Sequence, residues 1–348
     1  MDTSPKIKRE SKNKIRVEFE RAPLWERIKA KFFSMNFLKK VVFVIFRFVL
    51  LLGISYVILF PYISKIFQSF MSPSDFKDVT VVLISKNPTF DQYKYLITEN
   101  NYFPLLLKTF ALSLTTAIIQ TFICALIAYG LAKFKFKGNN LIFAIVVVTL
   151  MIPNEAISYS MYEYFNAWDY WALTEKIDAF FKSMGGKFSF MNSYIPMYLL
   201  SFTGLGFRNG LFIFMLRQFF RGVPDELEES AYVDGSSTMK TFFRIILPIS
   251  VPMLITVFIF SFAWQWTDDF YVGMFFNSIH VFNNGYPNIR EIVRAIPPSL
   301  LSGASGLPQY SAAITGTGTI LIALPLIIAY IFLQDKIVQG VERSGIVG

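Results

Sequence analysis

The sequence has few charged residues. Asp, Glu, Lys and Arg make up 16% of its 348 residues, whereas a typical soluble domain has about 25%. Hydrophobic residues make up 54% of the chain, and 39 residues are Phe. This balance disfavours a soluble globular protein and is typical of a membrane protein with lipid-facing helices.

Residues that support catalysis or metal binding are equally scarce. Cys124 and His280 are the only residues of their kinds, so an intramolecular disulfide is excluded and a Cys and His metal centre is disfavoured. No nucleophile signal surrounds His280, and no Gly-rich phosphate-binding loop ending in Gly-Lys-Ser or Gly-Lys-Thr occurs. We therefore expect no catalytic residues, no metal and no bound cofactor. Any hydrolysis of ATP with Mg²⁺ would belong to a separate chain.

Positive charge gathers near the start of the chain. The formal net charge is +9, and these basic residues precede the first apolar run: Lys6, Lys8, Arg9, Lys12, Lys14, Arg16, Arg21, Arg27, Lys29, Lys31, Lys39 and Lys40. A nucleic-acid arm is one interpretation, but interspersed glutamates weaken it. We interpret residues 1–40 as a cytoplasmic segment that contacts anionic membrane lipid, and expect no nucleic-acid partner.

Six apolar stretches are long enough to cross a bilayer as helices, at about 41–63, 109–132, 140–161, 193–220, 244–266 and 311–334. An even number of crossings places both termini on one side, and the basic N-terminus makes that side the cytoplasm. The basic turn at Lys133, Lys135 and Lys137 falls on the same side. We expect an all-α, multi-pass protein of the cell membrane, with a transmembrane domain at 41–348.

Several features interrupt this simple pattern. Pro153, Pro248, Pro252 and Pro325 lie within spans, where each removes a backbone hydrogen bond. They indicate either bent helices around a pathway or ordinary kinks. The external segment 162–192 is rich in aromatic residues and predicts a small, partly helical cap, and 267–310 forms a second external segment.

Residues 222–243 predict a short helix, a turn and a second helix on the cytoplasmic side. Pro224 suits a first helical position, and acidic residues follow in the opening turns, where they complement the positive end of the helix dipole. Gly235 supplies a left-handed stop, and Ser236 or Ser237 caps the second helix. On these grounds alone, the segment is equally compatible with an acidic helix that merely closes a loop.

The same segment resembles the signature loop of ATP-binding-cassette (ABC) importer permeases. That pattern is Glu-Ala-Ala, three residues, Gly, nine residues, Ile, one residue, Leu-Pro. Here Glu229-Ser230-Ala231, Gly235, Ile245 and Leu247-Pro248 fit every spacing, with Ser230 in place of the first Ala. The resemblance implies a type I importer permease fold with six spans and a coupling helix that docks on an ATPase subunit. The docking residues it implies are Asp225, Glu226, Glu229, Ser230, Ala231, Asp234 and Gly235.

Further matches narrow the resemblance to the second-subunit branch of the maltose-type carbohydrate uptake group. Residues 128–134, Met151-Ile152-Pro153, residues 216–220 and the tail from Gly340 to Gly348 carry these matches. The likeness does not cover the basic N-terminus or the 162–192 segment, and Asp335-Lys336 replaces the usual Arg-aromatic pair. It implies three kinds of protein partner: a second related permease, two ATPase subunits and an extracellular solute-binding protein. Membrane lipid, expected from the basic N-terminus and the apolar stretches, is a further partner.

Polar residues near the ends of spans are candidates for a solute pathway. Glu155 follows Pro153, and Arg208 with Asn209 interrupts the fourth apolar stretch, so they either face a water-filled path or are hydrated at the outer interface. Trp266, Asp268 and Asp269 combine an aromatic face with carboxylates, as in a sugar site, although an aromatic belt has the same composition. We therefore expect a carbohydrate importer subunit that is not itself an enzyme. The alternatives are a permease for a non-sugar solute, a self-contained channel or ion-coupled carrier, and a membrane scaffold.

Overall fold

The computed structural model describes residues 6–9, 15–18, 25, 35–170, 193–206, 208–276 and 289–345. The chain divides into two units, Met1–Lys65 and Ile66–Gly348. The expected cap at 162–192 lies largely outside the described residues, as does His280. Residues 162–170 of that cap continue a helix that begins at Asn154.

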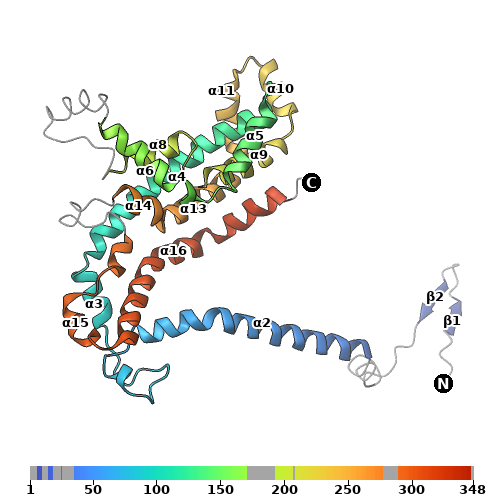
Figure 1. Ribbon diagram of the computed structural model, residues 1–348. Helices are drawn as coiled ribbons and strands as arrows, with labels where there is room; N and C mark the ends of the chain where they lie inside the picture. The colour runs from blue at the N-terminus through green and yellow to red at the C-terminus, as the bar shows by residue number, and fades with distance from the viewer. Residues whose placement is uncertain are drawn as a thin grey trace. The chain divides into compact units, whose positions relative to one another are not determined.

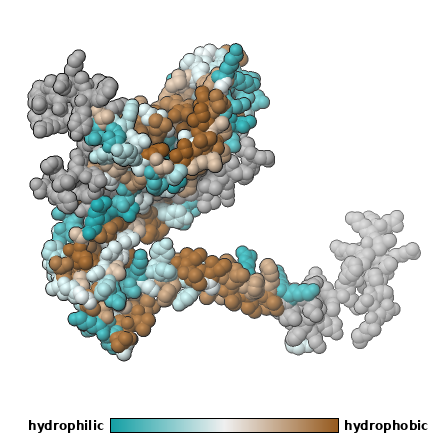
Figure 2. All heavy atoms as spheres, in the orientation of Figure 1, coloured by the Kyte–Doolittle hydropathy of each residue, from teal (hydrophilic) through white to brown (hydrophobic). Residues whose placement is uncertain are grey.

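The first unit contains the only strands among the described residues, which the all-α expectation did not include. β1 (Lys6–Arg9) pairs antiparallel with β2 (Ile15–Glu18), with Lys6 opposite Glu18. The long helix α2 (Met35–Gln68) begins in this unit. Its residues from 42 onward are almost all apolar and exposed (Figure 2). A helix that is apolar all round requires lipid or another protein around it.

The second unit is helical in its described residues. In chain order its elements are η1 (Asp75–Lys77), α3 (Asp91–Thr98), α4 (Tyr102–Lys133), α5 (Asn139–Thr149), α6 (Asn154–Tyr170), α8 (Ile195–Phe202), α9 (Asn209–Arg221), α10 (Glu226–Val233), α11 (Thr238–Thr241), the π-helical η2 (Phe242–Ile246), α12 (Leu247–Ile249), α13 (Val251–Trp266), α14 (Phe270–Phe275), η4 (Ile289–Val293), α15 (Pro298–Ala304) and α16 (Pro308–Gly345). Figure 1 shows α10 and α11 at one end of this unit, and α3 and α15 at the opposite end.

Helix α4 is the centre of the second unit. It packs along α13 and α9 and also contacts α8, α3 and η4. Near the α10 end, the core joins α4, α9, η2 and α13 through fully buried residues that include Phe212, Phe220 and Phe242. Near the opposite end, Trp266 and Tyr310 are the largest side chains of a second core that joins α3, η4, α15 and α16.

Three described helices are long and apolar enough to cross a membrane: Lys39–Gln68, Tyr102–Lys133 and Pro308–Asp335. A fourth crossing results if Thr238–Ile249 and Val251–Trp266, which bend by 79° relative to each other, are taken together. The expected third and fourth spans are each broken into two helices, α5 with α6 and α8 with α9. Long helices alone therefore do not reach the expected six spans.

The prolines have different effects on these helices. Pro153 lies in the break before α6. Pro248 lies inside the continuous helical run Thr238–Ile249, where its missing N–H removes a backbone bond. Pro252 occupies the first turn of α13, where a missing N–H removes no helical bond. Pro325 lies inside α16 without ending it. Proline therefore accompanies three outcomes: a break at Pro153, a bend near Pro248 and Pro252, and a continuous helix at Pro325. The sequence pattern alone does not distinguish these outcomes.

Candidate functional site

The first candidate site is the 222–243 loop, which forms the expected helix, turn and helix. Helix α10 starts after Asp225, whose carbonyl oxygen accepts hydrogen bonds from the N–H groups of Glu228 and Glu229, both at 3.0 Å. It ends at Val233, and Gly235, which follows the C-cap residue Asp234, has a φ of 76°. The Ser236 N–H donates to the Ala231 carbonyl (2.9 Å) and the Gly235 N–H to the Tyr232 carbonyl (3.0 Å). This pair of bonds is a Schellman stop.

The second helix of the loop is capped by one of the two expected serines. The backbone N–H of Lys240 donates to Ser237 Oγ at 3.4 Å. Ser236 instead supplies the N–H that closes the α10 stop. The expected left-handed glycine and the expected serine cap are therefore confirmed, and Ser237 is the capping residue.

The two faces of α10 differ in exposure. Glu228 and Ala231 are 7% and 6% exposed and face the rest of the chain. Glu226, Glu229, Ser230 and Val233 are exposed, at the i, i+3, i+4 and i+7 spacing of a single helix face. Asp234 and Gly235 are exposed at the turn that follows. Figure 2 shows hydrophilic residues over this end, beside a hydrophobic region where α5 and α9 lie.

Ala231 therefore differs from the other expected docking residues. Its small side chain permits a close approach, but that approach is to its own chain, because Ala231 is buried in the absence of any partner. The outward face instead combines carboxylates with Val233, which is 88% exposed. A surface with both charge and apolar area suits a protein partner better than open solvent.

The loop sits on a rigid aromatic base. The ring of Tyr129 in α4 lies 4.8 Å from that of Phe242 and 5.9 Å from that of Phe220, centroid to centroid. All three side chains are buried, and Val223 joins the same core. Dense packing resists deformation, so both ends of the loop are fixed to α4 and α9.

Two basic residues hold this end together, and the sequence did not assign either of them to the docking site. Lys133 Nζ lies 2.5 Å from Asp225 Oδ1 and donates to the Val223 carbonyl oxygen at 2.6 Å. Arg217 Nε donates to the Leu131 carbonyl oxygen at 3.2 Å, and its guanidinium carbon lies 3.7 Å from the centroid of the Phe143 ring. The sequence signal for Lys133 was its position in the last turn of an apolar helix, where cations meet free carbonyls. Arg217 lies before the last turn of α9, so its position gave no such signal.

The pairing also affects the Asp225 carboxyl. A hydrogen bond from Lys133, supplemented by its positive charge, lowers the pKa of Asp225 below the ordinary value. Asp225 is the N-cap residue of α10, yet its side chain makes no capping bond. The carboxylate is therefore committed to Lys133 rather than to the first turn of its own helix.

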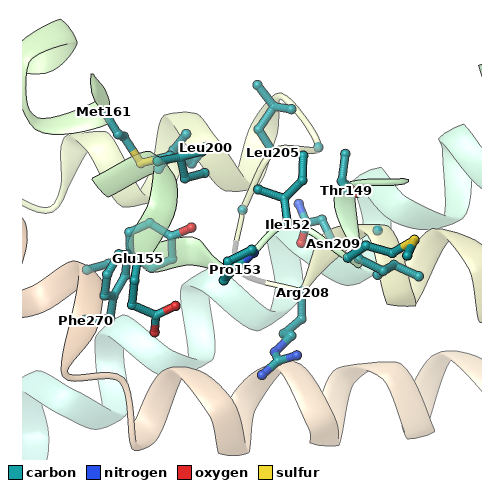
Figure 3. A pocket seen from close by; sticks show the side chains of 17 residues that line it. Thr149, Ile152, Pro153, Glu155, Met161, Leu200, Leu205, Arg208, Asn209 and Phe270 are labelled. Atoms are coloured by element: carbon teal, nitrogen blue, oxygen red, sulfur yellow. The ribbon is translucent and has the colours of Figure 1, made fainter. Parts of the chain in front are cut away.

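The second candidate site is a cavity of about 670 Å³ where the two broken helices meet (Figure 3). Residues 149–153, at the break between α5 and α6, line one part of this cavity. Residues 204–206 and 208–210, at the break between α8 and α9, line another part. Helix α8 ends in a Schellman stop, since Gly204 has a φ of 79° and the Leu205 N–H donates to the Leu200 carbonyl at 2.9 Å. Arg208 also has a left-handed φ, 63°, which is uncommon away from glycine and is found often at functional positions.

Three of the expected pathway residues line this cavity. Glu155 lies beside Phe270, and the Arg208 guanidinium carbon lies 5.4 Å from the centroid of the Trp264 ring (Figure 3). Asn209 is 1% exposed. Its side-chain Nδ2 and Oδ1 have no hydrogen-bond partner among the described residues. A buried amide without partners is costly, by about 1–3 kcal/mol, and is suited to bind a hydroxyl group that enters the cavity.

The other three expected pathway residues lie elsewhere. Trp266 is 1% exposed and donates its indole N–H to the Ile322 carbonyl at 3.0 Å. Asp268 is buried and accepts from the N–H groups of Phe270 and Tyr271, both at 3.1 Å, which caps α14. Asp269 is half-exposed and pairs with Arg290 at 3.7 Å and Arg294 at 3.5 Å. The structure gives each a local partner and brings none of them into the cavity lining.

Within the described residues, no group of three or more His, Cys, Asp and Glu side chains comes together to hold a metal. The residues at both candidate sites instead offer hydrogen bonds, charge and apolar contact. Such surfaces bind a solute or a protein without covalent chemistry.

Comparison with known proteins gives consistent results. Residues 120–343 match the family model described as the binding-protein-dependent transport system inner membrane component. The chain is 26% identical to the maltodextrin transport system permease protein MalD of Streptococcus pneumoniae, over 85% of this chain and 92% of that protein. It is 25% identical to the polygalacturonan/rhamnogalacturonan transport system permease protein YtcP of Bacillus subtilis (strain 168), over 86% and 96% of the two chains.

A solved structure shares the fold. A chain of a bacterial ABC transporter involved in the import of the acidic polysaccharide alginate superposes with a TM-score of 0.62 at 17% identity, over 87% of this chain and 98% of that one. The helix, turn and helix of the 222–243 loop and its spacing of Glu229, Gly235 and Pro248 lie within the residues that the family model matches. This chain belongs to the family of binding-protein-dependent transport system inner membrane components.

Proposed function

We propose that this chain is one of two membrane-spanning subunits of an ATP-driven importer, and that its solute is a carbohydrate, in particular an oligosaccharide. Its outward α10 face docks on an ATPase subunit, and a second related permease completes the pathway. A solute-binding protein delivers the solute from outside. The relatives support the solute class, because those named above are permeases for maltodextrin and for polygalacturonan or rhamnogalacturonan.

The observation that carries this proposal is the exposed face of α10. Glu226, Glu229 and Val233 project from a short helix whose other face, at Glu228 and Ala231, is buried against the rest of the chain. A loop that only connected two helices would not require a rigid base beneath an exposed acidic and apolar surface. When ATP binding closes the ATPase subunits, the docked loop moves with them, and the spans change from inward-facing to outward-facing. Such a shift requires contacts that differ between the two states.

We propose six crossings, with both termini in the cytoplasm. Helices α2, α4 and α16 each cross once, and the bent pair around Ser250 crosses once. The remaining two crossings are the broken pairs α5 with α6 and α8 with α9. At about 1.5 Å per residue, none of these four helices spans the ~30 Å hydrocarbon core alone. Contact of Lys133 with Val223 and Asp225 supports this topology, because it places the basic turn at 133–137 and the 222–243 loop at one end.

The cavity is proposed as part of the solute pathway. Its lining combines one carboxylate, Glu155, one guanidinium, Arg208, and the amide of Asn209, with aromatic side chains from Phe270 and Tyr271. Opposite charges in equal number favour a neutral, hydroxyl-rich solute over an ion. A sugar offers hydroxyls to the amide and an apolar ring face to the aromatic residues.

The test is Glu229→Lys in the complete importer. We expect the ATPase subunits to be lost from the purified complex and uptake to be abolished, while the chain remains in the membrane. Glu163→Lys is the matched control, since Glu163 is an exposed glutamate in α6. Solute-stimulated ATPase activity at the wild-type level in Glu229→Lys would contradict the docking assignment. Transport by vesicles that contain only this chain would instead indicate a channel or ion-coupled carrier.

A further inference from the structure

Helix α4 is a continuous connection between the two ends of the second unit. It runs without a break from Tyr102 to Lys133. At its start, the Tyr102 hydroxyl donates to the Leu321 carbonyl oxygen at 3.1 Å, and Thr109 Oγ1 accepts from the Ile289 N–H at 2.7 Å. Other helices of this unit are interrupted, by breaks at 150–153 and 203–208 and by a 79° bend at Ser250. Breaks absorb displacement, whereas an unbroken helix transmits it along its length.

Lys133, the last residue of α4, contacts the N-cap residue of the docking helix, Asp225. Its side chain is 5% exposed, although the Asp225 side chain that it pairs with is 76% exposed. The Lys133 side chain therefore lies beneath the loop, and its ammonium group binds the Asp225 carboxylate from the buried side. Because Asp225 is the N-cap residue of α10, a force on α10 acts directly on this pair.

The pair differs from an ordinary surface salt bridge. Exposed pairs contribute little, because both side chains are mobile and solvated. Lys133 is buried, and it also donates to the Val223 carbonyl oxygen at 2.6 Å, so its position is fixed by two acceptors. The nearby Lys135 and Lys137 belong to the same basic turn but are exposed. A role limited to the positive-inside pattern does not require Lys133 to be buried.

We propose that Lys133 is a positioning residue that couples movement of α10 to α4, so that the ATPase-driven displacement of the loop reaches the external end of the membrane unit through α4. The proposal rests on the proposed function, in which α10 is the docking helix. Lys133 does not itself contact the ATPase, because it lies behind Asp225. Docking and coupling are therefore separable: the outward face of α10 binds the partner, and Lys133 transmits the motion.

The test uses the complete importer in proteoliposomes and measures solute molecules taken up per ATP hydrolysed. In Lys133→Met we expect the ATPase subunits to remain bound and this ratio to fall about fivefold or more. A fivefold change is the lower end of the range that coupling between two sites typically produces. Lys133→Arg keeps a cationic donor and should retain most of the ratio. Asp225→Asn loses the charge pair but leaves the Val223 bond, so an intermediate loss is expected. Lys137→Met is the matched control and should behave as wild type.

Several outcomes would overturn the proposal. A wild-type ratio in Lys133→Met would show that the pair is incidental, and an equal loss in Lys137→Met would show a general effect of loop charge. If Lys133→Met does not reach the membrane, the Asp225→Asn variant provides the test, because its exposed carboxamide leaves the core intact. A wild-type ratio of solute taken up to ATP hydrolysed in Asp225→Asn would refute coupling. Failure of the proposed function can be distinguished from failure of the Lys133 proposal, because in the first case the wild-type chain would purify without ATPase subunits.

Discussion

At the scale of single residues, Gly235 shows how a backbone requirement fixes the shape of the docking surface. Its φ of 76° lies in the left-handed region, and a Cβ added there would meet nothing within 4 Å. Any effect of substitution therefore comes from the backbone conformation rather than from crowding. For most side chains this conformation costs about 1–2 kcal/mol, and a β-branched side chain tolerates it least.

We predict that Gly235→Val impairs uptake and that Gly235→Asn largely preserves it. A loss of about 1–2 kcal/mol lowers the equilibrium ratio of native to alternative turn conformations roughly 5- to 30-fold, and the alternative conformations misdirect α11 relative to α10. Asn adopts the left-handed conformation much more readily. The measurement is solute uptake normalised to the amount of chain in the membrane. Equal uptake by the two variants would show that the left-handed turn does not control coupling.

Residues within one local segment could be predicted from sequence, whereas residues that meet across the fold could not. The left-handed Gly235 and a serine cap followed from helix chemistry over a few positions. The pairing of Lys133 with Asp225 joins residues 92 positions apart, and no local pattern encodes it. The burial of Ala231 also depends on which face of α10 meets the rest of the chain. Glu155, Arg208 and Asn209 were recognised singly as polar residues in apolar stretches, but their meeting in one cavity required the fold.

At the scale of elements, the crossing of α9 over α5 depends on a glycine inside a helix. A Cβ on Gly210 would lie 2.6 Å from Thr149 Oγ1 and 3.2 Å from the Val146 carbonyl oxygen. Thr149 cannot move freely, because its hydroxyl donates to that same carbonyl at 2.6 Å. The two helices therefore approach too closely at this point for any larger residue.

We predict that Gly210→Ala destabilises the second unit by about 1–3 kcal/mol, as overpacking typically does. Gly273→Ala is the matched control, since Gly273 lies in helix α14 and a Cβ there would meet nothing within 4 Å. It should be neutral or stabilising by up to about 1 kcal/mol, because Ala favours helix. The midpoint of thermal unfolding of the purified chain in detergent compares the two. A Gly210→Ala chain as stable as wild type would mean that α5 and α9 can separate without loss.

The sequence predicted helical content better than helix continuity. Apolar length identified α2, α4 and α16, because each is one uninterrupted run. The stretches at 140–161 and 193–220 have similar composition but are broken in the structure. Pro153 indicated the first break. The second arises from the left-handed Gly204 and Arg208, and an arginine gives no sequence signal for a left-handed conformation.

At the scale of the whole molecule, the proposed topology places two valines, the most exposed among the described residues of the second unit, on opposite sides of the membrane. Val79 is 97% exposed in the segment that follows α2, and Val233 is 88% exposed on the outward face of α10. The first lies on the proposed external side, and the second lies on the cytoplasmic side. The native Cys124 is fully buried in α4, so the wild-type chain provides an unreactive background for thiol labelling.

We predict that a membrane-impermeant maleimide labels Val79→Cys in intact cells and labels Val233→Cys only after the membrane is permeabilised. Both positions are surface valines, so substitution by the slightly smaller, similarly apolar Cys should leave the fold unchanged. Wild-type chain treated in parallel should remain unlabelled under both conditions, since Cys124 is enclosed by the core of α4, α9 and α13. Labelling of Val233→Cys in intact cells would place α10 outside the cell, where no ATP is hydrolysed, and would remove the mechanical link between the loop and an ATPase.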